Sequence, residues 1–548
     1  MDNDEKTANV PKMRQVYMKA AVTVSWLGLE VEGTAAAFEY ASRLHTIYIH
    51  EMADQGKHVL IAEEEKEEVP HVQVKVGDPA LETLLCLLNR PYFERAWVIQ
   101  EVIVSNEVWF LCGSAIITWS SLLTAYVYLM ATKPWLWEFY PGLRTHLVLL
   151  MKFSEQEWTS GADVDCFGTL LRHRMCLSGD PRDKVYAFYG MRCKKALEDL
   201  GIEPNYDAET TTEVMYTRLA ARALHKAHVA VLHVPRLIIT PHEESDTNFI
   251  RLTLLSWVPD WRWTEATPMS LLLAEVGETN TVLRYHASAD SIFKPQFDLE
   301  TFNSTSTLSK HLSQLPKMLK LCGVTVAKVT QLTPRRWISR KTSIHQSLLE
   351  QAQLLQFDQY QIYEWEVFFR PKNPAQIYPA TGELATRARD ETIMAGTTQF
   401  APEIKRRAWA AFEKRQNVLR LLHKSHIHGF LVCYIVVVLI ERVLRRFGWT
   451  NPEAQSKCMV GHIWNRKGAT VVNSEDSELT YYALVPSICQ LGDHVVLVEG
   501  VTTPLVLRKK GEGIDATWEF IGDAYVHGIM KGELWEKRKG DRKDMWIT

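Results

Sequence analysis

The fold of this chain is decided by Arg90-Pro-Tyr-Phe-Glu-Arg-Ala-Trp-Val-Ile-Gln-Glu-Val102, followed closely by Val108-Trp-Phe-Leu-Cys-Gly113. The first segment places Trp97 and Glu101 four residues apart, so a helix brings both side chains to one face. The second segment is a short apolar run that predicts a strand. A helix that leads into a strand is half of an α/β unit, and we expect Trp97 and Glu101 at the mouth of an α/β cleft.

The residues before this segment predict the same class of fold. Residues 12–21 read as a helix with apolar side chains at helical spacing, and it leads into a β-rich run at 21–27 that Gly28 ends. Residues 34–52 predict a second helix, and Asp78-Pro79 predicts the start of a third that extends to Asn89. We therefore expect a parallel sheet with helices over residues 1–130.

A helical extension is predicted over residues 131–265. Asp180-Pro-Arg-Asp-Lys-Val-Tyr-Ala-Phe-Tyr-Gly190 reads as an N-capped helix with Pro in its first turn and Gly at its end. Residues 211–225 repeat the pattern of a turn followed by a helix. Ser256-Trp-Val-Pro-Asp-Trp261 is a compact aromatic segment in which Pro259 excludes a regular helix.

The region 266–548 ends in β structure, which we place at about residues 458–535. Four short predicted strands, at 481–485, 493–499, 504–508 and 518–522, recur about every ten residues with Gly and Pro between them. This spacing is typical of a small β barrel or sandwich. Residues 319–329 are predicted to form a strand pair, and 536–544 a charged, solvated tail.

Composition excludes several classes of protein. The chain has 548 residues with Lys+Arg 62 against Asp+Glu 65, so no global positive charge favours nucleic acid as a partner. Nine scattered cysteines without a CxxC pair argue against a disulfide framework and a zinc site. The GxGxxG, GxxxxGK[ST], HExxH and GxSxG motifs are absent. We expect no metal and no bound cofactor, and a cytoplasmic protein.

One apolar segment bears on membrane association. Residues 430–440 are eleven uncharged residues, whereas a spanning helix needs about 20. A buried helix or strand is the simplest interpretation. A membrane-associated segment and a non-native insertion are the alternatives.

Six separated segments resemble the fungal heterokaryon-incompatibility (HET) domain family. They are Arg14-Gln-Val with Val24-Ser-Trp-Leu-Gly28; Arg95-Ala-Trp-Val-Ile-Gln-Glu101; Cys112-Gly113 with Trp119; 180–187; 256–261; and 521–533. The resemblance implies a part in nonself recognition between fungal strains that leads to programmed cell death. The family's two opening strands, a Tyr-x-Ala-Leu-Ser-Tyr-x-Trp-Gly-like and a Cys-Ile-Asn-Gln-like segment, are absent, so we expect the chain to be amino-terminally truncated.

The resemblance also implies a candidate catalytic residue. HET domains are similar in layout to TIR domains, in some of which the Glu of a Trp-x-x-x-Glu segment cleaves NAD. Here Trp97 and Glu101 occupy that place, and a carboxylate near a ribose could stabilise the oxocarbenium-like charge that develops as nicotinamide leaves. NAD would then be a substrate. The structural alternative is that Glu101 pairs with Arg95 or Arg90 while Trp97 belongs to the core.

Other chemistry-bearing residues are interpreted as structural. Asp180, Arg182, Asp183 and Lys184 are expected to form a structural latch, with Asp180 as a helix cap and Arg182 as a carboxylate partner. Cys112 at a strand end is expected to be core. The cluster of His423, His426 and His428 lacks the spacing of a zinc site.

The favoured function is a signalling protein in incompatibility and cell death that acts through self-association and protein partners. The alternatives are an NAD glycohydrolase that uses Glu101, and a decayed, inactive paralogue.

Overall fold

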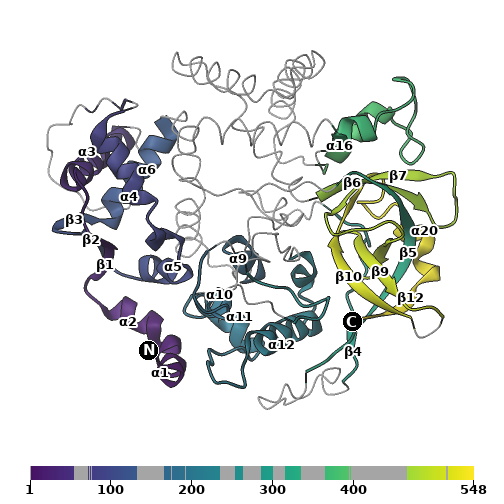
Figure 1. Cartoon of the computed structure of the whole chain (residues 1–548), viewed down its shortest axis with the longest axis horizontal. Helices are drawn as coiled ribbons and strands as arrows, with labels where there is room; N and C mark the ends of the chain where they lie inside the picture. Colours follow the sequence, from purple (N-terminus) through teal and green to yellow (C-terminus); the bar gives the residue numbers. More distant parts are fainter. Residues whose placement is uncertain are drawn as a thin grey trace.

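The computed structural model of the chain describes residues 2–54, 72, 74–75, 77–132, 166–174, 176–191, 193–234, 253–262, 285–299, 315–334, 364–393, 395–396, 466–513 and 516–548. They form an amino-terminal α/β part, a helical part and a carboxyl-terminal β barrel (Figure 1). The mixed α/β class predicted from the sequence is therefore confirmed.

A three-stranded sheet forms the centre of the amino-terminal part. Its strands, in spatial order, are β1 (Thr23–Gly28), β2 (Val108–Cys112) and β3 (Ala115–Thr118). β1 pairs with β2 in parallel, as the sequence predicts, whereas β3 returns antiparallel to β2. The sheet is thus mixed rather than parallel throughout. Gly113 permits the tight β2–β3 turn because its φ of 58° lies in the left-handed region.

The helices of this part (Figure 1) are α1 (Asn3–Asn9), η1 (Val10–Lys12), α2 (Met13–Lys19), α3 (Thr34–Asp54), α4 (Pro79–Leu88), η2 (Pro91–Glu94), α5 (Ala96–Ile103) and α6 (Trp119–Thr132). Of these, α2, α3, α4 and α5 were predicted from the sequence, whereas α1 was not. Asp78 begins α4 as predicted, since its carboxylate accepts hydrogen bonds from the backbone N–H groups of Ala80 and Leu81. Alternate residues of the strands, including Leu27 and Phe110, are buried in the core.

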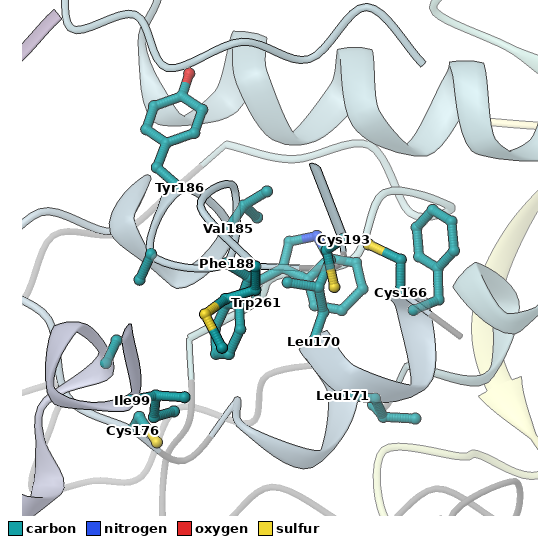
Figure 2. Packing of buried hydrophobic residues seen from close by; sticks show 14 of the residues in the cluster. Ile99, Cys166, Leu170, Leu171, Cys176, Val185, Tyr186, Phe188, Cys193 and Trp261 are labelled. Atoms are coloured by element: carbon teal, nitrogen blue, oxygen red, sulfur yellow. The ribbon is translucent and has the colours of Figure 1, made fainter. Parts of the chain in front are cut away.

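The helical part contains α9 (Cys166–Arg172), α10 (Asp183–Tyr186), α11 (Cys193–Asp199), α12 (Thr212–His225) and η3 (Val229–His233). Figure 2 shows its core, where Phe188, Leu170, Cys193 and Trp261 lie close together. The helix predicted at 211–225 is confirmed. The helix predicted at 180–190 is wrong in length, because the backbone N–H groups of Phe188 and Tyr189 bond three residues back and close successive turns instead.

The carboxyl-terminal part is a β barrel, as predicted. Its strands are β4 (Gln296–Phe297), β5 (Leu319–Leu332), β6 (Arg466–Asn473), β7 (Thr480–Pro486), β8 (His494–Val498), β9 (Leu505–Lys510), β10 (Thr517–Asp523), β11 (Tyr525–Val526) and β12 (Lys543–Ile547). Pairings run β5–β12–β10–β9–β8 and return from β8 to β5, which closes a ring. Two of the ring strands, β5 and β12, lie outside the range 458–535 in which the sequence placed the β structure.

The strand pair predicted at 319–329 is wrong, because these residues belong to the single long strand β5. Gly323 does not turn the chain. It lets β8 approach: a Cβ at this position would lie 2.7 Å from the carbonyl oxygen of Leu497. β5 pairs with β12 through its first half and with β6 through its second half, so one strand joins both sides of the sheet.

Three short elements cover the barrel, namely α16 (Ala385–Ile393), α20 (Trp535–Arg538) and η6 (Lys539–Asp541). The predicted tail at 536–544 is largely exposed, as expected, yet it continues into β12.

The helical part and the barrel share one hydrophobic core. The aromatic segment 256–261 is confirmed as buried, with Trp257 and Trp261 each 1% exposed. Ser256 joins it to the barrel, since its Oγ accepts a hydrogen bond of 2.9 Å from the backbone N–H of Phe520. A buried ion pair between Arg466 and Asp523 lies at the same junction, with His233 of η3 beside it. The two parts are therefore packed against each other and are not separate domains joined by a linker.

Two of the sequence interpretations fall outside the described residues: the apolar segment 430–440 and the histidines at 423, 426 and 428. Among the helices that the structure describes, none is long and apolar enough to cross a membrane.

Candidate functional site

The candidate site is the face of α5 that carries Trp97 and Glu101. Pro91 begins the short η2 turn, and Arg95 then adopts an extended conformation from which α5 starts at Ala96. Val98, Ile99 and Val102 on the other sides of α5 are buried in the core, which fixes the rotation of the helix. Trp97 and Glu101 remain half-buried at the surface of this core.

Glu101 lies beside β1 in a small polar cluster. The Tyr92 hydroxyl is 2.9 Å from Glu101 Oε2 and 2.8 Å from Ser25 Oγ. A phenol has one proton, and the carboxylate is the stronger acceptor, so Tyr92 donates to Glu101 and accepts from Ser25. Burial, and then the neighbouring Glu101 carboxylate, raise the pKa of Tyr92 well above its usual value, which keeps the phenol protonated as a donor.

Arg95 is the cationic neighbour of Glu101, as the structural interpretation proposed. Its Nη2 lies 4.0 Å from Glu101 Oε1, and the two side chains are 53% and 16% exposed. Such a long pair with an exposed partner contributes little free energy. Tyr17 of α2 packs nearby, and burial followed by Glu101 raises its pKa. Glu101 is therefore held chiefly by Tyr92.

Arg90, the other proposed partner of Glu101, has a different role. Its Nη1 and Nη2 donate to the carbonyl oxygens of Leu27 and Leu29 at 2.7 and 2.8 Å. It thus covers the carboxyl end of β1, where ligands of open α/β sheets usually bind. The Cys112 thiol also donates there, to Leu29 O at 3.5 Å, and Cys112 is buried, as expected of a core residue.

The position of Glu101 differs from the expected cleft mouth. Ser25, which shares the Tyr92 hydroxyl with Glu101, lies in the middle of β1. The backbone carbonyl of Glu101 accepts from Ser105, whose hydroxyl contacts Thr23 at the amino end of β1. The carboxylate therefore lies against the middle of β1 and not at the carboxyl edge of the sheet.

Trp97 connects α5 to the helical part. Its indole N–H donates to Asp183 Oδ2 at 3.0 Å, and the Tyr206 hydroxyl donates to Oδ1 at 2.6 Å. Burial raises the pKa of Asp183, although these two hydrogen bonds act in the opposite direction. The indole is thus a specific donor to a buried carboxylate as well as a core side chain.

The predicted latch at 180–184 is confirmed in its pairing. Arg182 donates through Nε and Nη2 to the two Asp180 oxygens at 3.0 and 2.8 Å, and its Nη1 reaches the carbonyl of Thr210. Asp180 accepts from the backbone N–H of Arg182, which forms a local turn and not a cap of α10. Lys184 is buried and donates to the carbonyls of Arg174 and Cys176.

Sequence reasoning missed Tyr92, Ser25, Asp183's role and Tyr206. Tyr92 lies in the segment 90–102, but its spacing from Glu101 does not predict a contact, because η2 and α5 are separate elements. Tyr206 is 109 residues from Trp97 in the chain, so only the fold brings them to one carboxylate. No group of three His, Cys, Asp or Glu residues suited to a metal ion occurs within the described ranges.

Two family models match parts of this chain. The model for the heterokaryon incompatibility protein (HET) family matches residues 1–101, and the model for the Het-6 beta-barrel domain matches residues 474–548. Heterokaryon incompatibility protein 6, OR allele, of Neurospora crassa is 23% identical over 611 aligned residues, covering 100% of this chain and 81% of the relative. No solved structure matches the chain significantly.

Proposed function

We propose that this chain, a heterokaryon-incompatibility (HET) domain protein, acts in fungal nonself recognition and signals programmed cell death through contacts with other proteins in the cytoplasm. The two domain matches and the curated relative support the role in heterokaryon incompatibility itself. Nonself recognition, cell death signalling and action through partners extend that role.

The observation that carries the proposal is how the two signature side chains are used. Trp97 donates to Asp183, and Glu101 accepts from Tyr92. Through these bonds Glu101 connects α5 to β1 by way of Tyr92, and Trp97 connects α5 to the helical part. Residues that hold the elements of a domain together give it a preorganised surface. Such a surface favours protein association, since ordering a mobile surface on binding weakens the complex.

An NAD glycohydrolase that uses Glu101 is the second candidate function. It is supported by Glu101 Oε1, which lies 4.0 Å from Arg95 Nη2, so this carboxylate oxygen is not committed to a short bond with that arginine. In such an enzyme this oxygen would accept hydrogen bonds from a ribose and stabilise positive charge on the sugar ring. The carboxylate is then needed in its ionised form.

The replacement Glu101→Gln separates the two candidates. Glutamine keeps the side-chain shape and an oxygen that can accept from Tyr92, but it removes the negative charge that an oxocarbenium-like transition state needs. The full chain would be expressed from an inducible promoter in hyphae, with vital-dye uptake as the measure of death and extracted NAD measured in parallel. Tyr92→Phe, which removes the donor to Glu101, is the matched structural variant.

An association module predicts equal cell death for wild type and Glu101→Gln, with NAD unchanged before dye uptake begins. Loss of both NAD depletion and death in Glu101→Gln at equal protein level would favour the hydrolase. Absence of any growth defect or dye uptake with abundant folded wild-type protein, also after fusion with an incompatible strain, would overturn the incompatibility signalling proposal.

A further inference from the structure

The amino-terminal sheet has an apolar face that the rest of the described chain does not cover. Val24 and Trp26 of β1 are 58% and 51% exposed, Ile116 of β3 is 55% exposed, and Trp109 of β2 is 36% exposed. Residues of the opposite face, such as Phe110, are fully buried. In Figure 1 the three strands lie at the margin of the molecule, beside α3, α4 and α6.

Strand register makes these side chains one continuous patch. Val24 is paired with Trp109, Trp26 with Leu111, and Leu111 in turn with Ile116. Cross-strand partners on one face are neighbouring side chains, so these residues form a continuous row across the three strands. The result is a flat apolar surface three strands wide, which is unlike the scattered apolar residues found on every protein surface.

The apolar patch supplies about two thirds of the area of the smallest specific interfaces, and its rim must supply the rest. Since a large aromatic side chain has about 150–250 Å² of surface, two half-exposed indoles with Val24 and Ile116 expose roughly 400 Å², comparable to the largest and often functional patches of monomeric proteins. Two such patches together remove roughly 800 Å² of apolar surface from water before any rim is counted, and specific interfaces begin near about 1,200 Å² in total.

The edge of the sheet is also open. β1 is the terminal strand in the order β1-β2-β3 and pairs with β2 alone in the described part of the chain. Val24-Ser-Trp-Leu27 contains neither proline nor a charged side chain, the usual devices that keep a free edge from associating. Both the face and the edge of β1 therefore favour association.

Charges at the two ends of β1 indicate the kind of partner. Lys19 lies four residues before the strand, and Glu32 lies four residues after it. Both are exposed, and neither forms an ion pair within the described ranges. A partner with the same face and the opposite strand direction would place its glutamate at this lysine. A second copy of the chain related by a twofold axis lying between the sheets and across the strands has these properties.

We infer that the face formed by Val24, Trp26, Trp109 and Ile116 is a homotypic docking surface, on which two copies of this chain pack sheet to sheet with β1 strands antiparallel. Packed sheets of this type lie about 10 Å apart with interdigitated side chains. Lys19 of each copy then faces Glu32 of the partner subunit, twice in each dimer. The inference names the partner of the proposed association function and rests on that function for its biological meaning.

Light scattering after size-exclusion chromatography and sedimentation velocity of the purified full chain test the surface. We expect the wild type to dimerise reversibly and Trp26→Glu to weaken the dimer at least 30-fold, the size of effect found for central aromatic residues of interfaces. Leu491→Glu is the matched control, because Leu491 is 65% exposed but belongs to the barrel. Circular dichroism of each variant verifies that it is folded.

Charge reversal provides an independent test that leaves the apolar face intact. Lys19→Glu and Glu32→Lys should each weaken the dimer several-fold, and the double reversal should restore it, because both ion pairs are rebuilt with opposite polarity. A monomeric wild type at 50–100 µM, or a dimer that tolerates Trp26→Glu, would overturn the inference; failure of the double reversal to restore the dimer would overturn the antiparallel arrangement.

The same variants distinguish this inference from the proposed function. If the wild-type protein is monomeric and still causes hyphal death, the docking surface is refuted while incompatibility signalling stands. If the wild type dimerises and Trp26→Glu weakens the dimer, but neither protein causes hyphal death, the surface stands and the signalling proposal is refuted.

Discussion

Removal of the Asp523 carboxylate should destabilise the junction between the barrel and the helical part. Asp523 at the end of β10 accepts from Arg466 Nη2 at 2.6 Å, and His233 Nδ1 of η3 lies 3.7 Å from its second oxygen. The Arg466 side chain is 1% exposed. Asp523→Ala therefore leaves a buried guanidinium without its counter-ion, and such breakage costs about 3–5 kcal/mol.

The pKa of Asp523 gives a second measure of the same interaction. Burial would raise this pKa, but Arg466 and then His233 outweigh burial and lower it from 3.8 to about 2. This depression corresponds to about 2 kcal/mol of stability. Because the folded pKa lies below the unfolded one, the contribution is complete above pH 3.8 and is lost as the pH falls from 3.8 towards 2.

Native-state hydrogen exchange of peptides that cover β6 and β10 measures the opening free energy of this junction. We expect a decrease of about 3–5 kcal/mol for Asp523→Ala and for Arg466→Met at pH 7, whereas the combined Arg466→Met, Asp523→Leu variant should lose much less than the sum. Lys510→Met, at a surface pair with Glu519 of 3.0 Å, is the control and should change stability by less than about 1 kcal/mol. Additive single effects, or losses equal to that control, would refute the reasoning.

Three further predictions follow from individual contacts. Trp97→Phe removes the indole donor to Asp183 and should lower the opening free energy of residues 180–189 by about 1.5–3 kcal/mol, measured by hydrogen exchange. Lys184 is buried, and burial lowers its pKa from 10.5 to about 8. Between these pH values the unfolded chain binds a proton that the folded chain has lost, so thermal stability should rise between pH 8 and 10. Lys184→Met should abolish this rise. Gly323→Val should open the β5–β8 pairing, because a Cβ at 323 would meet the Leu497 carbonyl oxygen at 2.7 Å, and should accelerate exchange of β8 amides by at least tenfold.

Each of these predictions has a control of the same residue type. Trp109→Phe changes a surface indole that donates to Glu107, and Lys194→Met changes a half-exposed lysine of α11. Gly540→Val adds a side chain at a position where a Cβ has no atom within 4 Å. Equal effects of target and control would show that the substitution type, and not the contact, determines the result.

Local patterns predicted the individual elements well where short-range physical chemistry decides them. Asp78 starts α4 by capping its own first turn, and Thr211 does the same for α12, so both starts were readable from neighbouring residues. The spacing of about ten residues between the short runs of β7, β8, β9 and β10, with Gly and Pro between them, likewise predicted a small barrel or sandwich. The helix at 180–190 was overestimated because a local cap signal at Asp180 is used for an arginine pair and a turn.

Sequence patterns did not predict the long-range contacts between elements. β5 closes the barrel by pairing with strands about 170 and 220 residues away, and nothing near Gly323 distinguishes a turn from a close approach of two backbones. The site shows the same division: the sequence determined that Trp97 and Glu101 share a helical face, because 3.6 residues per turn requires it. Only the tertiary structure decided that Trp97 bonds to Asp183 and Glu101 to Tyr92. Partners that are far apart in the chain, or on separate elements, are brought together by packing of the whole core and not by local preference.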